Sequence, residues 1–165
     1  MFALIFGLSF LANAQDVQKD QPKGYQFTDI KRLPATSVKD QARAGTCWSW
    51  SGISFFESEM IRMGKEPIDL SAMYIVRHAY SDKATKFVRL HGNMNFAVGG
   101  AFCDVMHVIK NYGIVPMDVY KGLNYGEPNH AFGEIDDVLA GYINAVIKNS
   151  NKKLSTAWKK GFDGI

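Results

Sequence analysis

The amino-acid sequence predicts an α+β fold class in which this chain supplies mainly helices. Two observations predict the helices: apolar residues recur at three- and four-residue steps in several segments, and Gly or Pro residues follow the ends of those segments. The composition, 47% hydrophobic and 21% charged, is that of a globular chain with enough apolar residues for one core. This helical periodicity does not predict β-strands. The β component of the expected fold class rests instead on motifs within residues 41–116.

The first element in chain order is an apolar leader. Residues 1–14 carry no charge and end in Ala12-Asn13-Ala14, a small-x-small pattern that signal peptidases accept. We therefore expect a signal peptide over residues 1–14, cleavage near Ala14 and export to the periplasm or the medium. The apolar run, about ten residues, is too short for a stable membrane span. A buried N-terminal strand or helix is the alternative, and residues 15–29 are expected to be a polar lead-in.

The first helix is expected to begin near Cys47, because the apolar residues that follow are spaced for one helix face. Gly64 is suited to the left-handed conformation that ends many helices. A second helix is expected from Asp69 or Ser71, since either side chain can cap the residues after it. Residues 82–96 are polar and are expected to be irregular.

Three more helices are expected in the second half of the chain. Residues 101–112 form an amphipathic pattern that Gly113 closes. Residues 134–148 have the strongest apolar stripe, with acidic residues in the first turn and Lys148 at the last, as the helix dipole favours. Residues 120–133 are rich in turn formers, and a short helix is expected from Ser155.

The segment QARAGTCWSW, residues 41–50, carries the chemistry of this sequence. A thiol in the first turn of a helix faces unpaired N–H groups and the positive end of the dipole, and both favour the reactive thiolate. Gln41 lies six residues before Cys47. Its amide donor and the Cys47 backbone N–H could together bind the oxyanion that forms when a carbonyl is attacked. We therefore expect Cys47 to be a nucleophile and Gln41 an oxyanion-hole donor.

These motifs resemble the papain superfamily of cysteine peptidases. Gln41 followed by Cys47-Trp48 matches the family pattern, and Val98-Gly99-Gly100-Ala101 matches its glycine pair before a helix. The resemblance implies a papain-like fold in which residues 30–165 form the helical part, with a central nucleophile helix and most of the β-rich half lying outside this chain. It also implies that the backbones of Gly99 and Gly100, with Gly45 opposite, align a peptide or protein substrate.

A branch of the family is suggested by two alanines. Secreted papain-type enzymes usually have a disulfide between the positions that Ala44 and Ala97 occupy here. The loss of both cysteines resembles the bleomycin hydrolase and aminopeptidase C branch. Two segments of the sequence are also similar to that branch, namely Val38-Lys39-Asp40-Gln41 and Tyr112-Gly113-Ile114-Val115-Pro116. That resemblance implies aminopeptidase action, extra helices after residue 120 and a homo-oligomer, since the branch tends to form closed rings.

The histidine that a cysteine nucleophile requires is not evident among the four in this chain, which are His78, His91, His107 and His130. In the resembling family it lies roughly 130–150 residues after the cysteine, or further. We therefore expect the catalytic histidine beyond Ile165, a chain truncated within its domain, and little peptidase activity in these residues alone. We also expect them to expose the face that the β-rich half covers.

Other functions receive less support from the sequence. The histidines and cysteines lack metal-ligand spacing, no cofactor motif is present, and the net charge of +3 is spread without an arginine-rich face, so neither a metal, a cofactor nor a nucleic acid is expected. Three alternatives remain: a non-catalytic papain-fold module that binds peptides, a thiol redox protein, and a helical interaction domain. A Cys47–Cys103 disulfide stays open, although Cys103 is expected to be a semi-buried structural thiol.

Overall fold

The computed structural model describes residues 24–150 and 153–165. The chain divides into two units, Met1–Arg32 and Leu33–Ile165. The described part of the first unit, residues 24–32, is exposed and non-helical. The expected signal peptide, residues 1–14, and most of the expected lead-in lie outside the described residues.

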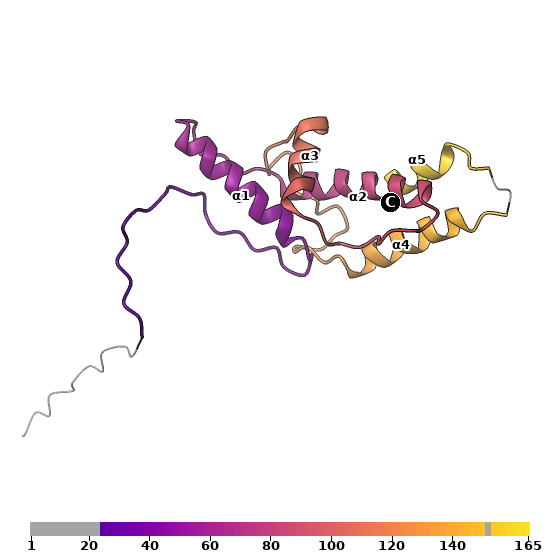
Figure 1. Ribbon diagram of the computed structural model, residues 1–165, viewed down its shortest axis with the longest axis horizontal. Helices are drawn as coiled ribbons and strands as arrows, with labels where there is room; N and C mark the ends of the chain where they lie inside the picture. Colours follow the sequence, from indigo (N-terminus) through magenta and orange to yellow (C-terminus); the bar gives the residue numbers. More distant parts are fainter. Residues whose placement is uncertain (1–23, 151–152) are drawn as a thin grey trace, which may run out of the picture. The chain divides into compact units, whose positions relative to one another are not determined.

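The second unit contains five helices, shown in Figure 1: α1 (Cys47–Arg62), α2 (Ala72–Arg89), α3 (Phe102–Tyr112), α4 (Gly133–Ile147) and α5 (Ala157–Gly164). In the described ranges, β pairing is limited to two isolated bridges. Arg43 pairs with Ala131 in parallel, and Leu70 pairs with Pro116 in antiparallel orientation. Both bridges tie a loop that precedes a helix to a later part of the chain.

The helix ends confirm most of the expected boundaries. The Ser71 hydroxyl accepts a hydrogen bond from the Tyr74 N–H at 3.0 Å and so caps α2. At the start of α3, the Asp104 carboxylate accepts from the Ala101 N–H at 2.8 Å. Gly64 and Gly113 follow α1 and α3 with positive φ angles of 78° and 82°, a conformation that glycine adopts without strain.

The expectation of an irregular stretch over residues 82–96 is wrong for its first half, because α2 continues to Arg89. Ala84, Phe87 and Val88 are buried, and they extend the apolar stripe of Tyr80 at helical spacing. The polar residues between them lie on the other side of the helix. Two turns of amphipathic helix were therefore hidden by the high polar content of the segment.

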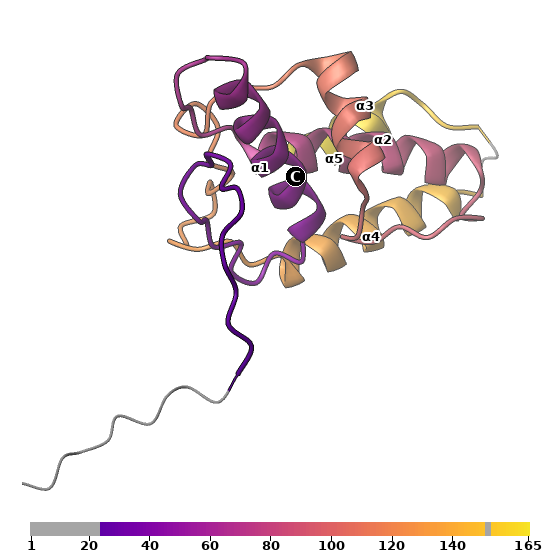
Figure 2. The same ribbon diagram turned by 60° about the vertical axis from the view of Figure 1, so that its left-hand side comes forward.

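Helix α2 is the centre of this unit, since it contacts α1, α3, α4 and α5. Figures 1 and 2 show α4 running along α2 in both views, with α3 on another side of α2. Among the described helices, α2 therefore contacts more neighbours than α1, which meets α2 and α3. Its apolar face and those of its neighbours form the core, whose most deeply buried members are Ile53, Ala72, Ile75, Ala84, Val105, Val108, Ile143 and Phe162.

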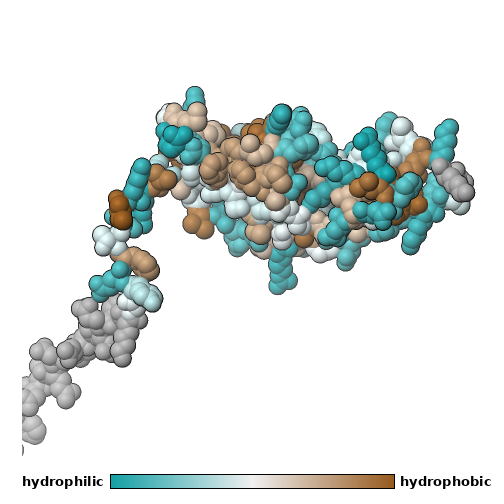
Figure 3. All heavy atoms as spheres, viewed as in Figure 1, coloured by the Kyte–Doolittle hydropathy of each residue, from teal (hydrophilic) through white to brown (hydrophobic). Residues whose placement is uncertain are grey.

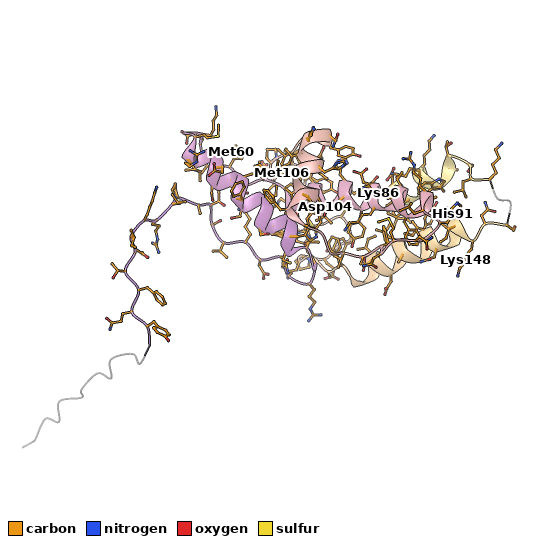
Figure 4. The ribbon with its side chains drawn as sticks, in the orientation of Figure 1. Met60, Lys86, His91, Asp104, Met106 and Lys148 are labelled. Atoms are coloured by element: carbon orange, nitrogen blue, oxygen red, sulfur yellow. The ribbon has the colours of Figure 1, made fainter. Side chains whose placement is uncertain are left out.

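Apolar side chains also remain exposed over α1 and α3, where brown and tan spheres gather in Figure 3. Phe102 stacks on Phe56 and meets Phe55 edge-on, and both ring centroid distances are below 6 Å. Figure 4 labels Met60 near the end of α1 and Met106 on α3. Phe55, Phe102 and Met106 each keep about half of their surface exposed. Among the described residues, no helix combines the length and apolar character needed to cross a membrane.

Candidate active site

Cys47 is the first residue of α1, and its thiol is free and exposed. The preceding residue, Thr46, does not cap the helix with its side chain, because its hydroxyl accepts from the Trp50 indole N–H at 3.1 Å instead. The first turn of α1 contains no acidic residue either. The N–H groups at this helix end therefore keep their partial positive charge available to an anion at Cys47.

The loop before Cys47 is held from one side by residues 130–132. The Arg43 N–H donates to the His130 carbonyl at 2.9 Å, and the Phe132 N–H donates to the Arg43 carbonyl at 3.3 Å. Gly45 has a φ of 62°, and a Cβ added there would come within 3.2 Å of Val98. A side chain at Gly45 would therefore meet both backbone strain and the segment that carries the glycine pair.

Gln41 lies at the start of this loop and is half-buried. Its Oε1 atom is buried and accepts no hydrogen bond within the described part of the chain. Among the described residues, the Gln41 Nε2 donor also forms no hydrogen bond with a protein acceptor. The structure thus places Gln41 and Cys47 at the two ends of one short loop.

The glycine pair lies against the residue that follows the thiol. The Trp48 indole N–H donates to the Val98 carbonyl at 3.0 Å. A Cβ added at Gly100 would come within 2.5 Å of the Trp48 ring, whereas Gly99 has nothing within 4 Å of such an atom. The structure therefore brings Gly45, Gly100 and Trp48 together around Cys47. Close packing on Trp48 is a reason for glycine at position 100 that the sequence pattern did not reveal.

A buried carboxylate on α1 anchors the base of the same loop, and sequence reasoning missed it. Glu57 is only 1% exposed. It accepts from the Leu70 N–H at 2.7 Å, from Lys39 Nζ at 2.9 Å and from the Thr36 hydroxyl. The sequence feature that could have indicated it is the presence of a glutamate within the apolar stretch after Cys47. A glutamate that is buried among apolar residues is rarely without a charged or hydrogen-bonding partner.

Lys39 connects this carboxylate to a second one. Its Nζ atom also pairs with Asp69 at 2.8 Å. Burial disfavours the Lys39 charge, but hydrogen bonds from the ammonium to Asp69 and Glu57 outweigh that effect and raise the pKa of Lys39. Because Lys39 lies two residues before Gln41, this network fixes the entry of the loop that contains the candidate oxyanion-hole donor.

Three of the four histidines are engaged away from Cys47. His78 stacks on Tyr112, with ring centroids 4.3 Å apart, and its burial lowers its pKa. His107 is exposed and pairs with Asp82 at 3.2 Å. His91 is an exposed turn residue with a φ of 50°. In the described ranges none of them forms a hydrogen bond with Cys47.

His130 differs from the other histidines because it is 7% exposed and its Nδ1 atom has no hydrogen-bond partner among the described residues. Its ring lies 5.8 Å from that of Trp50, centroid to centroid, and burial lowers its pKa. No hydrogen bond joins it to Cys47 within the described part of the chain. The sequence had placed His130 only in a turn-rich stretch, and burial on α1 was not foreseen.

Two further features bear on the chemistry of the site. Cys47 and Cys103 are both free thiols, so the disulfide alternative is not formed in this structure. The expectation that Cys103 is semi-buried is wrong, because its side chain is exposed in the first turn of α3. Residues 24–150 and 153–165 contain no group of three or more His, Cys, Asp or Glu side chains able to hold a metal ion. Cys47 thus has a free thiol at the start of α1.

A cavity with a volume of about 600 Å³ lies elsewhere, between α2, α4 and α5. Its walls include Tyr80, Phe132, Leu139 and Phe162. None of the candidate site residues lines it. Cys47 itself is exposed and does not border this cavity.

Comparison with known proteins agrees with this geometry. The family model described as papain family cysteine protease matches residues 22–157, which is most of the chain. A search of curated proteins gave no match. Together with the five helices and the near absence of β pairing in the described residues, the family match confirms the expected fold class: a papain-like α+β fold of which this chain forms a helical part.

Proposed function

Since the chain belongs to the papain family of cysteine proteases, we propose that it forms the nucleophile-bearing part of an aminopeptidase-like cysteine peptidase with Cys47 as nucleophile. The observation that carries the proposal is the exposed Cys47 thiol at the uncapped N-terminus of α1. On either side of it, Gly45 and Trp48 pack on the Val98–Gly100 segment, to which a peptide backbone could bind.

The proposed reaction begins with attack of the Cys47 thiolate on a peptide carbonyl carbon. A C–S bond forms, and the carbonyl oxygen becomes an oxyanion bound by the Cys47 N–H and by Gln41 Nε2. The C–N bond then breaks, and the leaving amine takes a proton from a histidine that we expect beyond Ile165. Water hydrolyses the resulting thioester and restores the thiol. Gly45, Gly99 and Gly100 align the substrate backbone throughout.

Assignment to the bleomycin hydrolase and aminopeptidase C branch is a further part of the proposal. It is supported by Ala44 and Ala97 in place of a cysteine pair and by the segments Val38-Lys39-Asp40-Gln41 and Tyr112-Gly113-Ile114-Val115-Pro116. The same branch suggests a homo-oligomer. Export after cleavage near Ala14 is proposed from residues 1–14 alone.

The test compares two single-thiol variants of the protein expressed from its full reading frame. Cys47→Ala should lower the hydrolysis of aminoacyl-aminomethylcoumarin on the order of 10³-fold or more, as loss of a nucleophile does. Cys103→Ala, the matched control, should keep the parent rate. Equal activity in both variants would refute Cys47 as the nucleophile.

Aminopeptidase specificity has a separate test. A dipeptidyl substrate with a free N-terminus should be cleaved much faster than the same substrate with an acetylated N-terminus. Equal rates on the two substrates would refute exopeptidase action while leaving peptidase function in place.

A non-catalytic peptide-binding module is the second candidate, favoured by the absence of a hydrogen bond between Cys47 and a histidine in the described residues. It predicts peptide binding that Cys47→Ala leaves unchanged and no hydrolysis by the protein from the full reading frame.

A further inference from the structure

The segment that contains the glycine pair, residues 97–100, is held by hydrogen bonds from side chains and not by the disulfide that secreted papain-type enzymes usually have at the position of Ala97. Lys83, which projects from α2, donates from Nζ to the Ala97 carbonyl at 3.2 Å and to the Gly99 carbonyl. The carbonyl between them, that of Val98, accepts from Trp48. Three successive carbonyls are thus each fixed by a side-chain donor, and two of these donors are N–H bonds of one ammonium group.

The ammonium group of Lys83 also lies over two aromatic rings. Its Nζ atom is 5.6 Å from the centre of the Trp48 ring and 5.7 Å from that of Tyr80, distances at which a cation is attracted to the ring face. Lys83 therefore contacts both the segment and the indole that packs on Gly100. It joins α2, the start of α1 and the glycine pair in one cluster.

The surroundings of Lys83 make this an unusual place for a lysine. Burial disfavours its charge and lowers its pKa, although Asp104 and Asp136 oppose this effect and the nearby Lys86 adds to it. Figure 4 shows Asp104 on α3 and Lys86 on α2. A half-buried ammonium is retained here with two carbonyls and two rings as its main partners, which indicates a role beyond surface charge.

Lys83 and Trp48 donate hydrogen bonds to the carbonyls of residues 97–99 but to neither backbone group of Gly100. The N–H and C=O groups of Gly100 form no hydrogen bond within the described residues, whereas its α-carbon is packed on the Trp48 ring. A backbone group held in place but unpaired is suited to pair with an extended peptide. Without the Lys83 contacts, the two glycines would have to be ordered at each binding event.

We propose that Lys83 is a positioning residue that fixes residues 97–100 in the conformation that binds the backbone of a peptide substrate. The inference rests on the proposed function of Cys47, because the segment is a substrate site only if Cys47 attacks peptides. Pre-ordering by Lys83 would strengthen peptide binding and leave the intrinsic reactivity of the thiol unchanged.

The test uses two alkylating probes that differ in their need for the segment. Iodoacetamide reaches the thiol without contacting residues 97–100, whereas Phe-Ala chloromethyl ketone presents a peptide backbone to them. Modification of the peptide that contains Cys47 is followed by mass spectrometry. The measured quantity is the ratio of the ketone rate to the iodoacetamide rate.

Lys83→Met keeps the aliphatic stem and removes the charge and the donors, so the rate ratio should fall about tenfold. Lys83→Arg retains charge and donors and should stay within about twofold of the parent. Lys86→Met, an exposed lysine in the same helix, is the matched control and should not change the ratio. A parallel fall of both rates in Lys83→Met, or an unchanged ratio, would overturn the inference.

A replacement variant and a comparison with free glutathione complete the test. If circular dichroism shows that Lys83→Met does not fold, Lys83→Gln replaces it. Gln retains an NH₂ donor on a shorter stem, and this variant must also lower the rate ratio. An unchanged ratio overturns the inference. The proposed function would instead be refuted if Cys47 in the parent protein had the same ratio of ketone rate to iodoacetamide rate as the thiol of free glutathione. The two failures are thereby distinguished.

Discussion

At the scale of single residues, the site depends on groups that the motif pattern contains and on others that only packing reveals. Gln41, Cys47 and the glycine pair could be predicted because their types and spacing are themselves the signal. Glu57 and Lys83 could not, because a charged residue on a helix is usually solvated, and only the three-dimensional packing shows what it meets. In both cases the buried charge binds the backbone of a neighbouring loop.

Glu57 provides the first residue-scale prediction. Glu57→Gln keeps an acceptor for the Leu70 N–H but removes the charge that pairs with Lys39, so the free energy of unfolding should fall by about 2 kcal/mol. Urea denaturation measures this change. Glu59→Gln is the matched control, since Glu59 pairs with Arg62 at the surface and its loss should shift the midpoint little. Equal shifts in the two variants would contradict a structural role for the buried pair.

Gly100 provides the second. An added Cβ would overlap the Trp48 ring at 2.5 Å, so Gly100→Ala should destabilise the protein by about 1–3 kcal/mol. The neighbouring Gly99→Ala places its methyl group in open space and should cost much less. Thermal unfolding of the two variants measures the difference. A larger loss at Gly99 than at Gly100 would show that the packing described around Trp48 is incorrect.

At the scale of helices, the sequence predicted where most of them begin and end, because capping residues and glycines mark those positions locally. Ser71 and Gly113 are examples. The exception is α2 beyond residue 81, where polar residues outnumber the buried Ala84, Phe87 and Val88. Contacts of α2 with four other helices decide that segment, and such contacts depend on residues far away in sequence.

The docking of α5 on α2 gives a pH-dependent prediction. Burial opposes the charge of Asp163, but hydrogen bonds from Lys159 and Ser81, with the nearby Arg77 charge, outweigh it and lower its pKa below the ordinary 3.8. The unfolded state therefore takes up the proton first as the pH falls, so the stability due to Asp163 is complete above about pH 3.8 and is lost as the pH falls through the lower folded pKa.

Hydrogen exchange of the α5 amides measures this effect. Exchange, corrected for its intrinsic pH dependence, should increase more in α5 than in α3 as the pH falls below 3.8. Asp163→Asn is the control, because it lacks the titrating group. Its α5 should be less protected at neutral pH and should show a smaller additional change in acid. An identical acid response in the two proteins would rule out Asp163 as the cause.

At the scale of the whole molecule, the described residues form a helical unit that leaves two kinds of surface open. One is the area around the exposed Cys47 thiol at the uncapped start of α1. The other is the set of exposed apolar side chains on α1 and α3, such as Phe55 and Met106. Fold class and family could be predicted because a few motifs identify them. The place of α2 at the centre could not, because it follows from the sum of many contacts.

The central claim is that Cys47 is a reactive nucleophile and Cys103 is not. Both lie in the first turn of a helix, but that of α1 has no acidic residue, whereas that of α3 contains Asp104 beside Cys103. The most direct measurement is the rate at which iodoacetamide alkylates each thiol in the same protein at neutral pH, read by mass spectrometry of the two cysteine peptides. Both thiols are free and exposed, so access alone does not separate them. The account predicts that Cys47 reacts at least about tenfold faster than Cys103. Equal rates, or faster reaction at Cys103, would contradict it.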